Sequence, residues 1–192
     1  MRKWKRIQTA DGPRFRSSLA AHEAVLLQNL VTSLLGMLEE RESSAPTDEL
    51  HAITGIRTGN PQPPQDDTLR RLLPDFYRPA TEHPAGSGTA ESLNSALRGL
   101  HEPEIIDAKR DAAQRLLDTL PDGGGKFELT ESDAQAWASA VNDVRLALGT
   151  MLDIRPDGPH RLSQEHPMAG HLDVYQWLTV LQEYLVLGLM GK

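Results

Sequence analysis

Hydrophobic residues recur at helical spacing in three long stretches of the chain. The first begins near Ala21 and carries leucines three or four positions apart: Leu27, Leu30, Leu34 and Leu38. The second follows Thr130, with spacings of four and three: Trp137, Val141, Val144, Leu148 and Met151. The third begins near Leu172: Val174, Leu178, Leu181, Leu185 and Leu189. Because each stripe needs a partner, we expect these helices to share a core that contains Trp137, Leu148, Leu34 and Leu181.

Shorter helices are predicted between these stretches. Thr47 can cap a helix over residues 48–53, and a second short helix over 67–73 ends at Pro74. Two more helices are predicted over 89–100 and 104–120, with Pro103 in the first turn of the latter, where its missing N–H has no partner to lose.

Strand patterns occur at two places. Residues 4–7 and 14–19 flank an Asp11-Gly12 turn, and their alternation predicts a β-hairpin with Phe15 and Leu19 on the buried face. Residues 126–129 alternate as a short strand that can pair with this hairpin. The expected fold class is mainly α: a packed helical domain with a small antiparallel hairpin or three-stranded element at one edge.

Length and composition set the domain organisation. A chain of 192 residues is within the range of one hydrophobic core, so residues 1–192 are predicted to form a single domain. Residues 43–66 and 79–88 are rich in proline, glycine and serine, and are predicted to be flexible linkers.

The chain contains no cysteine, which excludes disulfides, thiolate metal sites and a cysteine nucleophile. No apolar segment follows the basic start as in a signal peptide, and Gln182 and Glu183 interrupt the most apolar stretch, residues 177–190. We therefore expect a cytoplasmic protein without a membrane segment.

Charge is distributed unevenly along the chain. The formal net charge is −7, yet the first sixteen residues carry a net charge of +5, from Asp11 and six basic residues: Arg2, Lys3, Lys5, Arg6, Arg14 and Arg16. The remaining residues carry −12 and repel a phosphate backbone at long range. A contact with an acidic partner or a nucleic acid is therefore expected to use the basic N-terminal segment.

Two segments resemble chemical sites. Residues 123–126, Gly-Gly-Gly-Lys, suggest a phosphate loop, but Phe127 stands where Ser or Thr is needed and a strand follows, so we interpret them as a turn. His160, His166 and His171 occur in one loop with acidic residues, but their spacing matches no metal motif. We predict no metal and no cofactor, and keep an enzyme or metal site at this loop as an alternative.

One polar cluster lies on the helix that follows Thr130: Trp137, Asn142, Asp143, Arg145 and Gly149. A rotation of about 100° per residue puts Asn142, Arg145 and Gly149 in one line beside the apolar face. Gly149 costs about 1 kcal/mol relative to alanine inside a helix, which indicates a close neighbour. The cluster is either structural, with Arg145 forming a two-pronged ion pair with a carboxylate such as Asp75, or a clamp for a partner or ligand.

Three segments of the chain are similar to a known family: Trp137 followed by Asn142 to Thr150 and Leu152 to Ile154, then Leu69 to Tyr77, and Tyr175 to Thr179 with Gln182. They resemble an actinobacterial domain-of-unknown-function family, the family of the actinomycete oxidative-stress regulator. The resemblance implies a cytoplasmic regulatory protein that contacts transcription or proteolysis machinery. Two departures are Met151, where the family usually has arginine, and the absence of cysteine.

The function predicted from these features is a non-enzymatic regulatory or protein-interaction module, with a link to stress-responsive transcription implied by the resemblance. One alternative is direct DNA binding through the basic N-terminal hairpin. The other is an enzyme or metal site at the loop between His160 and His171.

Overall fold

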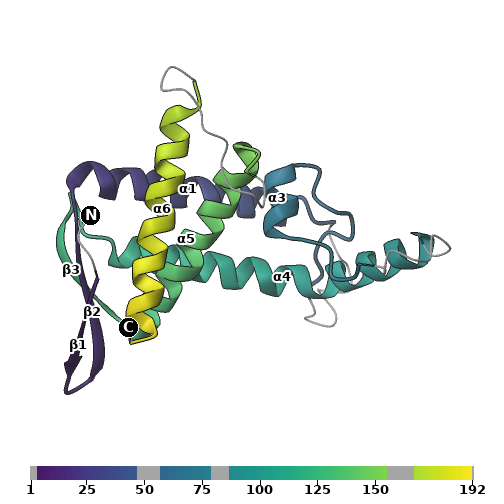
Figure 1. Cartoon of the computed structure of the whole chain (residues 1–192). Helices are drawn as coiled ribbons and strands as arrows, with labels where there is room; N and C mark the ends of the chain where they lie inside the picture. Colours follow the sequence, from purple (N-terminus) through teal and green to yellow (C-terminus); the bar gives the residue numbers. More distant parts are fainter. Residues whose placement is uncertain (1–3, 47–56, 79–86, 155–166, 192) are drawn as a thin grey trace. The chain divides into compact units, whose positions relative to one another are not determined.

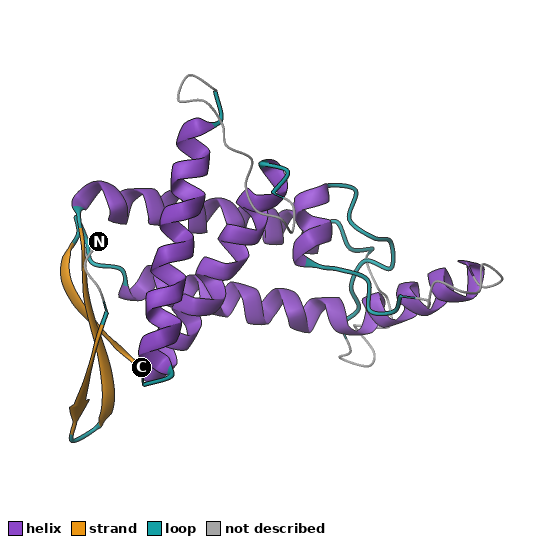
Figure 2. Ribbon diagram, viewed as in Figure 1, coloured by secondary structure: helices purple, strands orange, loops and turns teal. Residues whose placement is uncertain are grey.

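The computed structural model describes residues 4–46, 57–78, 87–154 and 167–191. Within them the elements are β1 (Lys5–Thr9), β2 (Gly12–Leu19), α1 (Ala21–Ser43), α3 (Asp67–Leu72), α4 (Ser87–Thr119), β3 (Gly125–Thr130), α5 (Glu131–Met151) and α6 (Ala169–Leu189) (Figure 1). The fold is mainly helical with a small antiparallel sheet, which confirms the predicted fold class (Figure 2).

Two compact units can be distinguished in the chain. The sheet unit comprises Met1–Leu35 and Lys109–Lys192, and the middle unit comprises Gly36–Ala108. Their boundaries fall inside α1 and α4. The single domain and the linkers at 43–66 and 79–88 stay predictions, and the helix expected over 48–53 lies outside the described residues.

The three strands form one antiparallel sheet in the order β1-β2-β3. The predicted hairpin is confirmed: Thr9 pairs with Gly12, whose φ of 105° lies in the left-handed region that glycine tolerates. The expected third strand is also confirmed, because β3 pairs with β2 over its whole length. Phe15 and Leu19 are buried as predicted, so one face of the sheet belongs to the core.

Three aromatic rings fill the centre of the sheet unit. Trp4 lies edge-on to Phe127 and to Trp137, with centroids 5.4 and 5.8 Å away, and Phe127 stacks on Trp137 at 5.1 Å. The indole Nε1 of Trp137 donates a hydrogen bond to Thr119 Oγ1 at 2.7 Å, so its polar atom is satisfied in the core.

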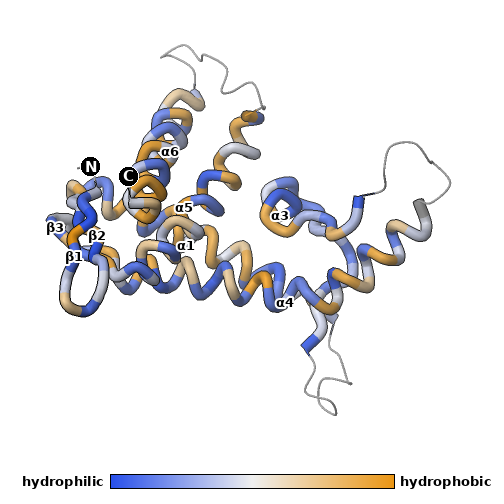
Figure 3. Tube along the Cα trace, turned by 60° about the horizontal axis from the view of Figure 1, so that its bottom comes forward, coloured by the Kyte–Doolittle hydropathy of each residue, from blue (hydrophilic) through white to orange (hydrophobic). Residues whose placement is uncertain are grey.

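The helices of the sheet unit begin close to the predicted positions. A capping box between Thr130 and Asp133 opens α5, as expected, and α6 begins at Ala169, three residues before Leu172. The two helices lie side by side, with hydrophobic positions recurring along both (Figures 1 and 3). All four residues predicted for the core are buried, namely Leu34, Trp137, Leu148 and Leu181.

The prediction of two helices separated near Pro103 is wrong, because α4 runs without a break past this residue. Proline lacks the N–H that would bond the carbonyl four residues earlier, which leaves Gly99 O without its helical donor. The backbone N–H of Gly59 donates to Gly99 O at 2.7 Å and replaces the missing bond. A Cβ at position 59 would lie 2.9 Å from Pro103 Cδ, so only glycine permits this approach.

A buried ion network forms the centre of the middle unit. Glu102 is 2% exposed and accepts hydrogen bonds from Arg41 Nε at 2.7 Å and from Arg98 Nη1 at 2.9 Å. Arg41 also donates to Gln62 O at 2.6 Å, and Arg98 donates to Asp75 Oδ1 at 2.7 Å. The network therefore connects α1, α4 and the segments on both sides of α3.

Candidate interaction face

The outer face of the sheet carries four basic residues. Alternation along β2 directs Phe15 to the core and Arg14 and Arg16 to the opposite face. Lys5 is the register partner of Arg16, and Lys126 is the partner of Ser18, so both belong to the same outer face. We call Lys5, Arg14, Arg16 and Lys126 the basic face.

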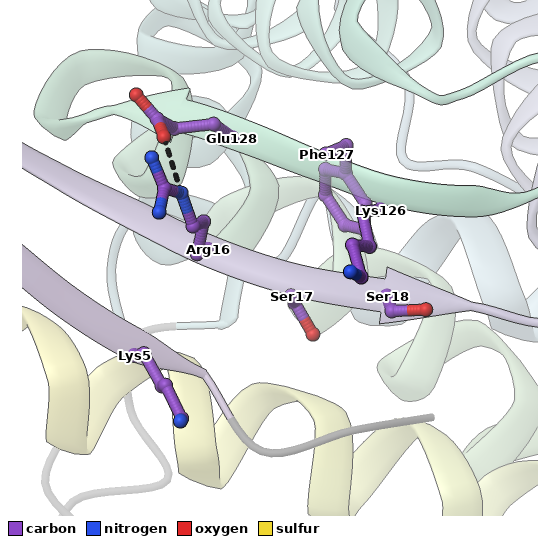
Figure 4. Close-up of a pocket in the computed structure, with 7 residues that line it drawn as sticks. All are labelled: Lys5, Arg16, Ser17, Ser18, Lys126, Phe127 and Glu128. Atoms are coloured by element: carbon purple, nitrogen blue, oxygen red, sulfur yellow. Dashed lines mark hydrogen bonds and ion pairs between the residues drawn. The ribbon is translucent and has the colours of Figure 1, made fainter.

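A groove of about 650 Å³ lies over this part of the sheet, lined by residues that include Lys5, Arg16, Lys126 and Glu128 (Figure 4). Arg16 Nε donates to Glu128 Oε2 at 2.7 Å, and both side chains are partly exposed. Within the described part of the chain, Lys5, Arg14 and Lys126 have no ion-pair partner. The face therefore presents three unneutralised cations on a chain whose formal net charge is −7.

The six basic residues that were predicted to contact a partner do not all lie together in the structure. Lys5, Arg14 and Arg16 share the basic face, whereas Arg2 and Lys3 lie outside the described residues. Arg6 pairs with Phe15 in the register and so belongs to the other face, where its Nη1 approaches Gly191, just after α6. Lys126 was missed, although the alternation of residues 126–129 would have found it once β3 was aligned with β2.

Two members of the polar cluster on α5 have structural roles. Trp137 is fully buried in the aromatic core. Asp143 is 5% exposed and accepts a hydrogen bond from Lys109 Nζ at 2.7 Å. Burial raises the pKa of the Asp143 carboxyl above its usual range, and the neighbouring Lys109 ammonium opposes this increase.

Gly149 has the close neighbour that was expected from the energetic cost of a glycine inside a helix. A Cβ at this position would lie 3.3 Å from Cε2 of Tyr175, so the ring of this α6 residue occupies the space that a side chain would fill. Gln182 of α6 also donates to Ala138 O at 3.3 Å. The line formed by Asn142, Arg145 and Gly149 is therefore flanked by contacts of α5 with α6.

Asp75, the example given for a carboxylate partner of Arg145, is bound by Arg98 within the middle unit. The chain that follows α3 brings the Asp75 carboxylate close to Arg98 on α4. The spacing of hydrophobic residues in the sequence does not reveal this path. Arg145 Nη2 donates only to Asn142 Oδ1, at 3.3 Å, and its Nε is buried without a partner in the described structure. The clamp interpretation of this cluster stays untested.

Arg145→Ala is expected to change the free energy of unfolding by less than about 1 kcal/mol, because one long hydrogen bond from the guanidinium to an uncharged amide oxygen is lost and one unsatisfied buried donor disappears. Arg145→Lys should be equally mild. Urea denaturation of both variants checks this, and a loss of several kcal/mol would show that Arg145 holds a buried carboxylate after all.

The predicted alternative site at the histidine loop is described only at its end. His171 is exposed on α6, and His160 and His166 lie outside the described residues. In the part of the chain that the structure describes, no group of three His, Asp or Glu side chains is arranged to hold a metal ion. None of the described helices is long and apolar enough to cross a membrane.

The sequence pattern of the family described as "Domain of unknown function (DUF2017)" matches residues 1–189. The chain belongs to the DUF2017 family. This confirms the resemblance found in the sequence. Because the match covers nearly all residues, both units of this DUF2017 chain lie within the family's extent.

Curated relatives share most of the sequence of this DUF2017 chain. Proteins named "Oxidative stress regulator AosR" from Mycobacterium tuberculosis (strain ATCC 25618 / H37Rv) and Mycobacterium bovis are each 66% identical over 195 residues, covering 100% of this chain and 89% of the relative. A Mycobacterium leprae relative is 63% identical over 194 residues, with the same coverage. No solved structure matches the chain.

Proposed function

We propose that this DUF2017 protein is a non-enzymatic regulator that binds a partner protein, and that its basic face receives an acidic segment of that partner. The observation that carries the proposal is the gathering of Lys5, Arg14 and Lys126 on one sheet face, where none of them has an ion-pair partner among the described residues. Opposite charge on a partner would direct association to this face and fix its orientation.

The names of the mycobacterial relatives support a regulatory role linked to oxidative stress. Thiol chemistry in this chain cannot supply the sensing, because it has no cysteine. A thiol-based redox signal would therefore have to be sensed by the partner, and this chain would respond through its affinity for that partner.

An acidic protein segment fits the basic face better than duplex DNA does. Glu128 pairs with Arg16 in the lining of the groove, so among the described residues the face presents a short cluster of three unpaired cations and not an extended basic track for a phosphate backbone. Outside the basic face the chain carries a strong excess of acidic residues, which repels a long polyanion more than a short acidic segment.

The double variant Lys5→Glu with Lys126→Glu is expected to weaken partner binding about tenfold or more, because attraction becomes repulsion at two positions of the face. The partner is first identified by affinity purification from the native host with the tagged wild-type protein. Its affinity for each purified variant is then measured at two salt concentrations.

The matched control is Arg71→Glu with Arg78→Glu, which changes the net charge equally at two exposed positions of the middle unit. This control should bind the partner like the wild-type protein. Equal weakening by both double variants would show that only net charge matters. Salt-sensitive binding to a 20-base-pair duplex, lost in the Lys5 and Lys126 variant, would instead support the DNA alternative.

A further inference from the structure

The N-terminal half of α4 exposes an apolar stripe on the side opposite the buried ion network. We call Leu93, Ala96, Leu97 and Leu100 the apolar seam. Their spacings of three, one and three place them on one helical face, whereas Arg98 and Glu102 point into the middle unit and are 1% and 2% exposed. Leu93 is 41% and Leu100 is 56% exposed, so the described residues leave this face uncovered.

Two aromatic residues are fixed beside the apolar seam. The Asn94 side chain holds the backbone of Tyr77 through two hydrogen bonds, accepting from its N–H at 2.8 Å and donating to its carbonyl at 2.9 Å. The ring centroids of Phe76 and His101 are 6.0 Å apart. Both rings are exposed although the backbone that carries them is tied to α4. Because the backbone of Tyr77 is held against α4 before binding, ordering this segment costs less entropy when a partner binds.

We infer that the apolar seam binds the same seam of a second copy of this chain, with the two α4 helices antiparallel. The pattern of the seam is symmetric about the point between Ala96 and Leu97. A two-fold axis at this point brings Leu93 of one copy to Leu100 of the other, and Ala96 to Leu97. A homodimeric contact needs this kind of self-complementary surface.

Charge selects the antiparallel orientation. Between residues 92 and 100 the only ionic side chain is Arg98, which is turned inward, so two acidic chains can meet here without facing carboxylates. The seam ends at Glu104, whose side chain is 82% exposed. In an antiparallel pair Glu104 faces Thr89, whereas in a parallel pair the two Glu104 carboxylates would repel each other.

The size of the seam sets the strength of the contact. Four aliphatic residues and two flanking rings make a small surface, and interfaces below about 1,200 Å² in total are typical of weak association. We therefore expect a reversible dimer whose population rises with protein concentration. This surface lies entirely in the middle unit, and the inference does not depend on the basic face.

Sedimentation equilibrium of the full chain tests the dimer. The mass of the wild-type protein should rise from 21.2 kDa toward twice this value with increasing concentration, while Leu100→Glu should stay monomeric. Because Leu100 is exposed, circular dichroism should show the same folded helix content in both. Val180→Glu, at another exposed apolar position on α6, is the control and should dimerise like the wild-type protein.

Disulfide trapping tests the orientation, and the absence of native cysteine makes it clean. In the antiparallel pair, the two copies of residue 96 are offset by about 1.5 Å along the helix axis, and those of residue 89 by roughly 22 Å. A disulfide needs Cα atoms within about 7 Å. Ala96→Cys should therefore crosslink rapidly under mild oxidation, and Thr89→Cys should not.

Three results would overturn the inference. The wild-type protein could remain monomeric at every concentration, which would leave the seam to a different partner. The Leu100→Glu variant could dimerise as strongly as the wild-type protein, which would place the contact elsewhere. Both cysteine variants could crosslink equally, which would indicate a parallel pair.

Discussion

Replacing Glu102 with alanine is expected to lower the free energy of unfolding by roughly 3–5 kcal/mol. The carboxylate is 2% exposed and pairs with two guanidinium groups that are themselves 7% and 1% exposed, those of Arg41 and Arg98. After the substitution Arg98 keeps Asp75, but Arg41 keeps only carbonyl oxygens. Water solvates the Arg41 guanidinium in the unfolded chain. In the folded variant this cation would be buried without a carboxylate, and the unfavourable free energy of that burial lowers the stability.

Urea denaturation measures this effect, with Glu104→Ala as the matched control. Glu104 lies two residues further along α4, and its side chain is 82% exposed, so its removal should cost less than about 0.5 kcal/mol. Glu102→Gln keeps the shape and loses the charge, and should fall between the two. Equal stability of the two alanine variants would show that the network contributes nothing to folding.

The importance of Glu102 could not be predicted from the sequence. Arg98 and Glu102 are four positions apart on a helix, which is a visible pattern, but many such pairs are exposed and contribute little. What buries this one is the path of residues 57–66, whose carbonyl groups reach Arg41. The same segment supplies the Gly59 N–H that lets α4 continue past Pro103. Both effects depend on contacts between distant parts of the chain.

Features that depend on near neighbours were predictable. The capping box at Thr130, the alternation around Phe15 and the leucine spacing in α1 each involve residues within one or two turns, and these elements begin where expected. Three of the four residues of the basic face were predictable for the same reason. Arg14 and Arg16 follow from alternation in one hairpin, whereas Lys126 requires the register between β2 and a strand more than one hundred residues away.

Lys109→Met is expected to destabilise the sheet unit by roughly 3 kcal/mol at pH 7, because it leaves the buried Asp143 carboxylate without its cation. Lys126→Met, on the exposed face of the sheet, is the control and should have little effect. The double variant Lys109→Met with Asp143→Asn should recover much of the loss, since no buried charge remains.

The loss caused by Lys109→Met should shrink as the pH falls from 7 to 5. Burial already raises the pKa of Asp143 in the folded protein, and Lys109 is the group that opposes this increase, so its removal raises the pKa further. Between the unfolded pKa and this higher folded pKa, the folded state binds more protons than the unfolded state. The stability of the folded variant therefore falls as the pH rises through the folded pKa, and it recovers as the pH falls.

Thermal denaturation of the Lys109→Met variant and the wild-type protein at pH 7 and pH 5 measures the change. A deficit that is equal at pH 7 and pH 5, and that persists in the Asp143→Asn double variant, would mean that lost packing of the lysine stem and not an unpaired carboxylate causes it.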